Sequence, residues 1–320
     1  MSLSKLRNLN APTDIDKVKS TKFSLLLMGI GLYTLSKTTI FTLKWIWRNF
    51  FINEQDLKLK YGNGWVIITG VFNDIGYGYI GEFISKGHKV CLIANDENKL
   101  KEKIEKIIEE YPTSRNMLKY IVYDFNKYYT DNDYNELKTK LDETIGQDEI
   151  SILVNNIEVY TTKSFKLLTN EQINEMLNVN ISGIVFIMKI LLNKMEKRDK
   201  RSLVITSGSM LSRMRFGGFA VYSGTKAFIE AYNECLAKEY ENIDFTYLEM
   251  GPIKTNMVNI STTSLTHTLP RETANEALKK VGRYQFITPH VKHDLIRTIY
   301  WNSWLIRKIV VINRDNLNNN

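Results

Sequence analysis

Short runs of β-branched and other apolar residues alternate with longer helical patterns between residues 64 and 255. The apolar runs predict strands at residues 65–69, 89–94, 118–123, 150–154, 202–207 and 243–249. The stretches between them repeat apolar residues at helical spacing and predict helices, among them 97–111, 131–145 and 171–195. This alternation is typical of βαβ units. The sequence therefore predicts an α/β fold, a Rossmann-like doubly wound parallel sheet, over residues 51–288.

A long apolar segment precedes this domain. Residues 1–22 are polar and lysine-rich, and we expect them to be flexible, whereas residues 23–50 are mostly apolar. About 20 apolar residues cross a bilayer, so this segment predicts an N-terminal membrane helix rather than a buried core helix. Lys37 interrupts it, at a cost of roughly 2.5–3.5 kcal/mol at mid-bilayer. The segment therefore either spans the bilayer with Lys37 reaching toward the surface or lies partly in the interface, with the tryptophans and basic residues of 44–48 at its end.

A second apolar stretch lies near the C-terminus, at residues 294–312, and contains Arg297, Arg307 and Lys308. Aromatic and basic residues mixed in this way favour an amphipathic interfacial helix. A helix packed on the domain is the alternative. We expect residues 289–320 to form a C-terminal amphipathic helical extension associated with the membrane.

Composition narrows the range of functions. The 320 residues are 43% hydrophobic and 24% charged, as expected for one large domain with attachments. The net charge of +8 suits an anionic membrane surface or a phosphorylated substrate. We expect no nucleic-acid partner, because basic residues do not form a stripe interleaved with aromatics.

Cysteine and histidine spacing argues against disulfides and metals. Cys91 lies in an apolar strand-like run and Cys235 in a helical pattern, and neither belongs to a CxxC motif. We expect two buried free thiols. His290 and His293 are three residues apart, but no carboxylate or cysteine cluster accompanies them, so no metal site is expected.

The segment TGVFNDIG, which begins at Thr69, follows the first predicted strand and precedes a helix. Such a turn presents backbone N–H groups and a helix N-terminus to a pyrophosphate. Gly70 permits the tight turn and Gly76 permits close approach. Asp74 conflicts with this role, because its carboxylate repels a pyrophosphate unless it points away. An ordinary strand–helix turn is the alternative.

The second chemical pattern is Tyr222-Ser-Gly-Thr-Lys226. On a helix, residues i and i+4 share a face, and an ammonium beside a phenol stabilises the phenolate. We therefore expect Lys226 to lower the pKa of Tyr222, so that the phenol becomes a usable proton donor or acceptor. The strand that ends in ITSGS supplies a serine to bind a carbonyl oxygen. Ser207 and Ser209 are the main candidates, and Ser212 is a more distant one.

Asn180 lies inside the predicted helix 171–195. A buried asparagine needs hydrogen-bond partners, and one hypothesis is a water that links Asn180 to Lys226. A core asparagine satisfied by its neighbours is the alternative.

Taken together, these residues resemble the short-chain dehydrogenase/reductase family, a Rossmann fold, over residues 64–255. The resemblance assigns Asn180, Ser207 or Ser209, Tyr222 and Lys226 to the family's catalytic tetrad. The family's TGxxxGxG, NNAG and PGxxxT motifs match here with departures: Asp74 and Glu158 replace glycines, and Met250 replaces a proline. The resemblance implies a cofactor site made of Thr69, Gly70, Asn73, Ile75, Gly76, Asn95, Asp124, Asn155, Asn156, Tyr222, Lys226, Gly251, Ile253 and Thr255.

A narrower resemblance covers nearly the whole chain. The N-terminal anchor, VCLIANDENKL, YSGTKAFIEAYNECLAKEY and LPRETANEALKKVG are similar to the branch of very-long-chain 3-oxoacyl-CoA reductases and 17-beta-hydroxysteroid dehydrogenases. That branch implies NADPH-dependent reduction of a 3-oxoacyl-CoA in fatty-acid elongation. It also implies an endoplasmic-reticulum membrane location with a cytosolic catalytic domain. A lipophilic acyl-CoA or steroid substrate is expected, and a homodimer or elongation-complex partners are further options.

NADP(H) is the expected cofactor, although Asn95 stands where the branch often has an arginine. No acidic residue occupies Ala94, where NAD-dependent members often carry one. Two other functions stay open. One is a steroid dehydrogenase. The other is a catalytically weak, cofactor-binding membrane protein, because Asp74 and Glu158 place negative charge where the family has glycine.

Overall fold

The computed structural model describes residues 14–127, 129–254 and 267–302, and its chain divides into two compact units, Met1–Ile52 and Asn53–Asn320. The first unit contains helix α2 (Asp14–Phe50), of which Thr21–Phe50 is long and apolar enough to cross a membrane, with no buried residue in its most apolar window. Helix α2 thus begins inside the segment that we expected to be flexible. The hydroxyls of Thr34, Thr38 and Thr42 each donate to the carbonyl four residues earlier, so they need no water in an apolar medium.

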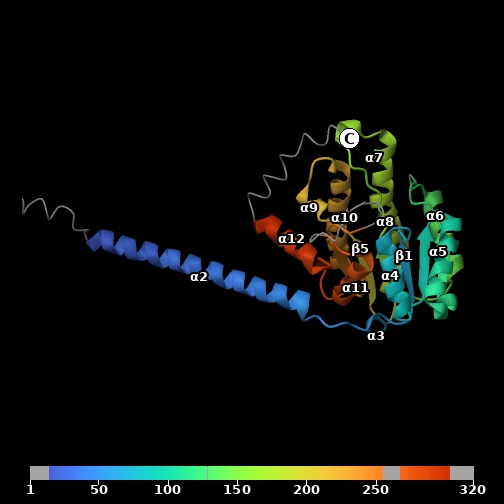
Figure 1. The fold of residues 1–320 in the computed structure, drawn as a ribbon, viewed down its shortest axis with the longest axis horizontal. Coiled ribbons are helices and arrows are strands. Elements are labelled where there is room, and N and C mark those ends of the chain that lie inside the picture. The colour runs from blue at the N-terminus through green and yellow to red at the C-terminus, as the bar shows by residue number, and fades with distance from the viewer. Residues whose placement is uncertain (1–13, 128, 255–266, 303–320) are drawn as a thin grey trace, which may run out of the picture. The chain divides into compact units, whose positions relative to one another are not determined.

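The second unit alternates strands and helices (Figure 1). Its elements are α3 (Leu57–Tyr61), β1 (Trp65–Thr69), α4 (Asp74–Ser85), β2 (Val90–Ala94), α5 (Glu97–Glu110), η2 (Pro112–Asn116), β3 (Leu118–Val122), α6 (Asp131–Ile145), β4 (Ile150–Asn155), η3 (Phe165–Leu167), α7 (Asn170–Leu177), η4 (Asn178–Gly183), α8 (Ile184–Glu196), β5 (Ser202–Ser207), α9 (Leu211–Met214), α10 (Ala220–Glu239), β6 (Ile243–Leu248), α11 (Pro270–Lys280), β7 (Phe286–Ile287) and α12 (Val291–Asn302). The six predicted strands are confirmed to within one residue at each end.

The strands form one seven-stranded sheet in the order β3-β2-β1-β4-β5-β6-β7, and each neighbouring pair is parallel. The predicted doubly wound parallel sheet is therefore confirmed. The strand order reverses between β1 and β4. In open α/β sheets, ligands bind outside the carboxyl ends of the strands at such a reversal.

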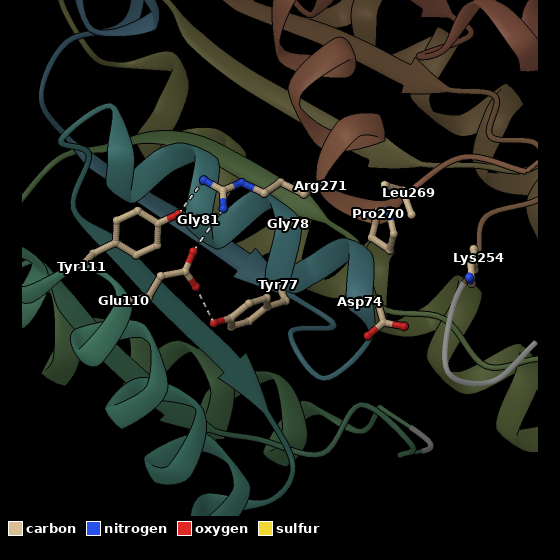
Figure 2. A pocket seen from close by; sticks show the side chains of 10 residues that line it. All are labelled: Asp74, Tyr77, Gly78, Gly81, Glu110, Tyr111, Lys254, Leu269, Pro270 and Arg271. Carbon is tan, nitrogen blue, oxygen red and sulfur yellow. Dashed lines mark hydrogen bonds and ion pairs between the residues drawn. The ribbon is translucent and has the colours of Figure 1, made fainter. Parts of the chain in front are cut away.

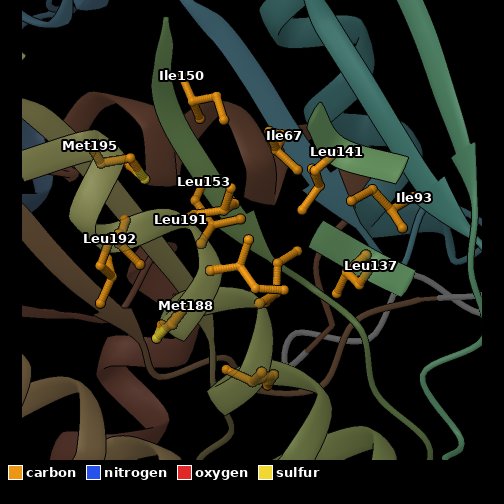
Figure 3. Close-up of a cluster of buried hydrophobic side chains, with 14 of the residues drawn as sticks. Ile67, Ile93, Leu137, Leu141, Ile150, Leu153, Met188, Leu191, Leu192 and Met195 are labelled. Carbon is orange, nitrogen blue, oxygen red and sulfur yellow. The ribbon is translucent and has the colours of Figure 1, made fainter. Parts of the chain in front are cut away.

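The side chains of the strands enter two cores, one on each face of the sheet. In β1, Ile67 belongs to the core formed with α6, α8 and α10, and part of this core is drawn in Figure 3. The next residues on either side, Val66 and Ile68, belong to the core formed with α4, α5 and α11. A strand buried on both faces gives a continuous apolar run, which is why the sequence predicted these strands well.

Two features differ from the sequence-based predictions. Strand β7 was not predicted, because Phe286–Ile287 is too short to show a pattern. The single predicted helix 171–195 is interrupted by the π-helical segment η4, which contains Asn180. The whole stretch Asn170–Glu196 is also long and apolar enough to span a membrane, but about half of its most apolar window is buried in the domain.

The described part of the predicted C-terminal extension, residues 289–320, favours the alternative of a helix packed on the domain. Helix α12 packs on the domain: Tyr300 contacts Met210 and Met214, and its hydroxyl donates to the Met214 carbonyl at 3.0 Å. Leu295 and Ile299 on α12 stay about half exposed. Residues 303–312 of the predicted interfacial helix lie outside the described residues. Cys91 is buried as expected, but Cys235 is exposed, and both are free thiols.

Candidate active site

The loop after β1 is hydrogen-bonded to the residues that follow β4. The predicted glycine-rich segment from Thr69 and the segment Asn155–Glu158 therefore meet where the strand order reverses. The Thr69 hydroxyl oxygen accepts from the backbone N–H of Asn156 at 3.1 Å and of Ile157 at 3.3 Å. Gly70 has a φ of 67°. A Cβ there would lie 2.3 Å from the Asn156 carbonyl oxygen, so only glycine allows this close approach.

Asn156 links this loop to β5. Its Nδ2 donates to the Gly70 carbonyl at 2.9 Å and to Asn73 Oδ1 at 3.0 Å, while its Oδ1 accepts from Ser207 Oγ at 2.9 Å. Ser207 is buried, and its hydroxyl proton is used in this contact. The structure therefore gives Ser207 a supporting position.

Ser209 is the serine that reaches the tyrosine. Its side chain lies beside the Tyr222 phenol and favours the phenolate, against the larger opposing effects of burial and Glu158 on the pKa of that group. The backbone N–H of Ser209 donates to Tyr247 Oη at 3.3 Å, which holds the turn after β5 in place. Of the candidates that the sequence left open, Ser209 thus lies where a hydroxyl and a phenol can bind one carbonyl oxygen.

Tyr222 and Lys226 lie one turn apart on α10, as predicted, but a third residue joins them. Tyr222 Oη donates to Glu158 Oε2 at 3.0 Å, and Lys226 Nζ lies 2.8 Å from the same oxygen. Lys226 also donates to the Ser207 carbonyl at 3.0 Å. Tyr222 and Lys226 are both buried, whereas the Glu158 side chain is 23% exposed.

This arrangement changes the expected acidity of the phenol. Burial first, and the negative charge of Glu158 second, raise the pKa of Tyr222 well above its usual value. The prediction that Lys226 lowers this pKa is therefore wrong for the site as the structure shows it. The physical reason is that burial and the Glu158 carboxylate outweigh the Lys226 ammonium, which is itself ion-paired with that carboxylate.

Asn180 is not aimed at Lys226. Its Oδ1 accepts from the Val159 N–H at 2.8 Å, and its Nδ2 donates to the Val159 carbonyl at 2.8 Å and to Thr225 Oγ1 at 3.2 Å. Asn180 is fully buried in η4. It thus fixes the backbone next to Glu158, which favours the alternative of an asparagine satisfied by its neighbours.

The remaining predicted cofactor residues lie at the carboxyl ends of neighbouring strands. Asn95 follows β2 and Asp124 follows β3, and both are exposed. Asn155 ends β4 and is buried, and its carboxamide atoms find no partner among the described residues. Asn73 caps α4 by accepting from the Gly76 N–H at 2.7 Å. Ile75 is buried in the core, so only its backbone is available to a ligand.

The segment Gly251–Ile253 depends on a residue that the sequence did not single out for this role. His293 Nδ1 accepts from the Gly251 N–H at 3.2 Å, and Nε2 lies 2.9 Å from the Pro252 carbonyl. Burial lowers the pKa of His293 to about 4, which keeps the imidazole neutral and able to make both bonds. Thr255 lies outside the described residues.

A cavity of about 430 Å³ lies on the outer side of α4 (Figure 2). Its lining includes Asp74, Tyr77, Tyr111 and Arg271, and none of the predicted catalytic residues is among the described residues that line it. The Arg271 guanidinium donates to Glu110 and to the Tyr111 hydroxyl. The cavity is therefore separate from the Tyr222 site.

Comparison with known proteins agrees with this geometry. The family model for short chain dehydrogenases matches residues 64–265. The very-long-chain 3-oxoacyl-CoA reductase of Homo sapiens is 28% identical over 256 residues, which cover 77% of this chain and 78% of the human protein. The Rattus norvegicus protein of the same name is 28% identical over 251 residues, which cover 77% and 76%.

Solved structures share the fold. A 7beta-hydroxysteroid dehydrogenase superimposes with a TM-score of 0.67 at 20% identity and covers 80% of this chain and 98% of its own. A short-chain dehydrogenase from Sphingobium yanoikuyae in complex with NADPH gives 0.61 at 19% identity and covers 75% and 94%. The chain belongs to the short chain dehydrogenase family and is an NAD(P)-dependent oxidoreductase that acts on carbonyl or alcohol groups.

Proposed function

We propose that this protein reduces a 3-oxoacyl-CoA with a very long acyl chain to the 3-hydroxyacyl-CoA, with NADPH as hydride donor, at the endoplasmic-reticulum membrane. One observation carries the reductase chemistry: Ser209 and Lys226 both lie beside the Tyr222 phenol, at the carboxyl end of the sheet. The substrate class rests on the relatives' names.

The residues at the sheet reversal fit a dinucleotide. The backbone of the loop from Gly70 to Gly76 and the N-terminus of α4 suit the pyrophosphate. The carboxamide of buried Asn155, which has no partner among residues 14–127, 129–254 and 267–302, offers a donor and an acceptor. Exposed Asn95 and Asp124 suit the adenosine half. When bound, the cofactor supplies the hydride for the carbonyl carbon.

The protein's own residues supply the proton and the binding of the oxygen. Ser209 and Tyr222 donate hydrogen bonds to the substrate carbonyl, and Tyr222 passes its proton to that oxygen. A positioned acid or oxyanion donor of this kind contributes about 10²–10⁴-fold to a rate. Lys226, held by the Ser207 carbonyl, places a positive charge beside the reacting groups.

The test is NADPH oxidation by the purified full chain with a panel of 3-oxoacyl-CoAs of rising chain length, beside Tyr222→Phe. We expect turnover by the parent chain and a loss of about 10²-fold or more in kcat/KM for the variant, because the proton donor is removed. Equal rates in the two proteins would refute the role given to Tyr222.

A steroid ketone is the second candidate substrate, since a solved hydroxysteroid dehydrogenase shares the fold. Comparing kcat/KM for a long 3-oxoacyl-CoA with that for a 17-keto steroid separates the two. A third candidate, a weakly catalytic cofactor-binding protein, is motivated by the carboxylates of Asp74 and Glu158. NADPH binding in a fluorescence titration, without turnover of either substrate, would favour this third function over both reductase functions.

A further inference from the structure

Glu158 lies where one carboxylate oxygen contacts both the Tyr222 hydroxyl, at 3.0 Å, and the Lys226 ammonium, at 2.8 Å. A phenol has one proton to donate. While Tyr222 donates it to Glu158, the hydrogen bond favours the protonated phenol over the phenolate, because the phenolate would lie against a carboxylate.

The structure holds Glu158 at this place from both sides. The next residue, Val159, has its N–H and its carbonyl both bonded to Asn180. Two residues earlier, Asn156 is tied to Gly70 and Ser207. The backbone that carries Glu158 is therefore fixed, and its side chain reaches the buried pair from a partly exposed position.

Charges on the other elements do not offset this effect. Lys226 on α10 is the cation that faces Tyr222, 5.6 Å from the ring centroid, and it is ion-paired with Glu158 itself. Tyr247 on β6 also disfavours the phenolate, whereas Ser209 after β5 favours it. Tyr160 contacts the Tyr222 ring at 5.8 Å between centroids.

We propose that Glu158 is a positioning residue that keeps the proton on Tyr222 and thereby sets the pH range in which the site reduces a carbonyl. The inference rests on the proposed reductase function. In reduction, the carbon gains a hydride from the reduced nicotinamide cofactor and the oxygen gains the Tyr222 proton, which leaves a phenolate. Oxidation is the reverse and must start from that phenolate, which Glu158 opposes.

The test measures kcat/KM against pH in both directions for the full-length parent and for Glu158→Gln, with the 3-oxoacyl-CoA and the matching 3-hydroxyacyl-CoA. We expect the alkaline loss of reduction and the alkaline onset of oxidation to move together in the variant, to lower pH by about one unit or more. If the alkaline limbs of the pH profiles, meaning the loss of reduction and the onset of oxidation, stay unchanged in the variant, the proposal is overturned.

Glu175→Gln is the matched control, because Glu175 is an exposed carboxylate on α7 with no ion pair described. It should leave both limbs in place. Glu158→Gly, which restores the glycine of the family motif, is the second variant in case the amide substitution misfolds, and it should shift the limbs at least as far.

A second readout does not need turnover. Tyrosinate absorbance is titrated for the parent and Glu158→Gln, each with and without Tyr222→Phe, and the differences isolate Tyr222. We expect it to ionise at lower pH without the carboxylate. If no substrate turns over, the proposed function fails, but this titration still decides the role of Glu158: an unmoved Tyr222 titration overturns it.

Discussion

At the residue scale, two serines near the end of β5 have different surroundings. The Ser207 hydroxyl donates its hydrogen bond to Asn156 Oδ1, whereas the Ser209 side chain lies beside the Tyr222 phenol. Spacing along the chain could not separate them, because both follow the same strand and both precede the same helix. The two serines differ in their neighbours: Ser207 meets Asn156 after β4, and Ser209 meets Tyr222 on α10.

We therefore predict opposite signatures for two alanine variants. Ser209→Ala should lower kcat/KM by about 10²-fold with little change in stability, because it removes a donor to the carbonyl. Ser207→Ala should lower the free energy of unfolding by about 1–3 kcal/mol, because Asn156 Oδ1 is left buried without a donor. Steady-state kinetics and denaturant unfolding of both proteins check this. A larger kinetic loss in Ser207→Ala would reverse the assignment.

The sequence predicted the Tyr222–Lys226 pair because their contact is set within one helical turn. It could not place Glu158 between them, since that contact joins residues more than 60 positions apart and depends on the loop after β4. The departure from the family motif at Glu158 was visible, but the direction of its side chain was not. His293 was missed for the same reason, because its partners lie 41 and 42 residues away.

At the scale of elements, strands were easier to predict than interruptions of helices. Strands buried on both faces are continuous apolar runs, and Thr130 and Thr169 cap α6 and α7 with recognisable capping boxes. The π-helical η4 leaves the apolar spacing of its helix nearly unchanged, so periodicity did not reveal it. Segment η4 carries Asn180, whose side chain hydrogen-bonds to the backbone of Val159 and so holds the loop after β4 in place.

A buried ionic group links β6 to α12 and α9. Glu249 follows β6 and is 1% exposed, with Arg297 at 3.6 Å and Arg213 at 3.9 Å. Its Oε2 receives no hydrogen bond from the described residues. Burial raises the pKa of Glu249 to about 7.

This shift predicts a pH dependence of stability. A carboxyl whose pKa is raised from 4.5 to about 7 on folding stabilises the fold below the lower value, and this contribution is lost as the pH rises to the higher one. Glu249→Gln should therefore gain stability over the parent between these values, by roughly 1–3 kcal/mol at pH 8. Thermal melts of both proteins across this range check it, and a constant difference would contradict it. The comparison is needed because buried His88 and His293, with pKa values lowered to about 4, give the opposite slope.

At the scale of the whole molecule, α2 and the catalytic unit are separate bodies along the chain. Nearly all the exposed large apolar side chains of residues 21–51 belong to α2, while the catalytic unit has its own two-sided core. Exposed apolar surface of this extent suits a bilayer rather than water. Trp45 and Trp47, near the end of α2, suit the boundary between the bilayer and water.

Removal of residues 1–52 should move the protein from the membrane fraction to the supernatant, because the apolar helix is lost. Reduction of a short, soluble 3-oxoacyl substrate should persist within about threefold, since the site lies in the other unit. Fractionation after carbonate treatment and steady-state assays check both. A truncated protein that still pellets with membranes would assign attachment to the C-terminal segment, where Leu295 and Ile299 are exposed.

The exposed thiol of Cys235 offers a practical handle. The chain has two cysteines, and the other, Cys91, is buried in the sheet, with a pKa raised by burial to about 12. A maleimide dye or spin probe should thus attach at one position, on the same helix as Tyr222 and Lys226 but well away from them along its length. Such a label would turn α10 into an optical or magnetic reporter of ligand arrival in the native, full-length protein.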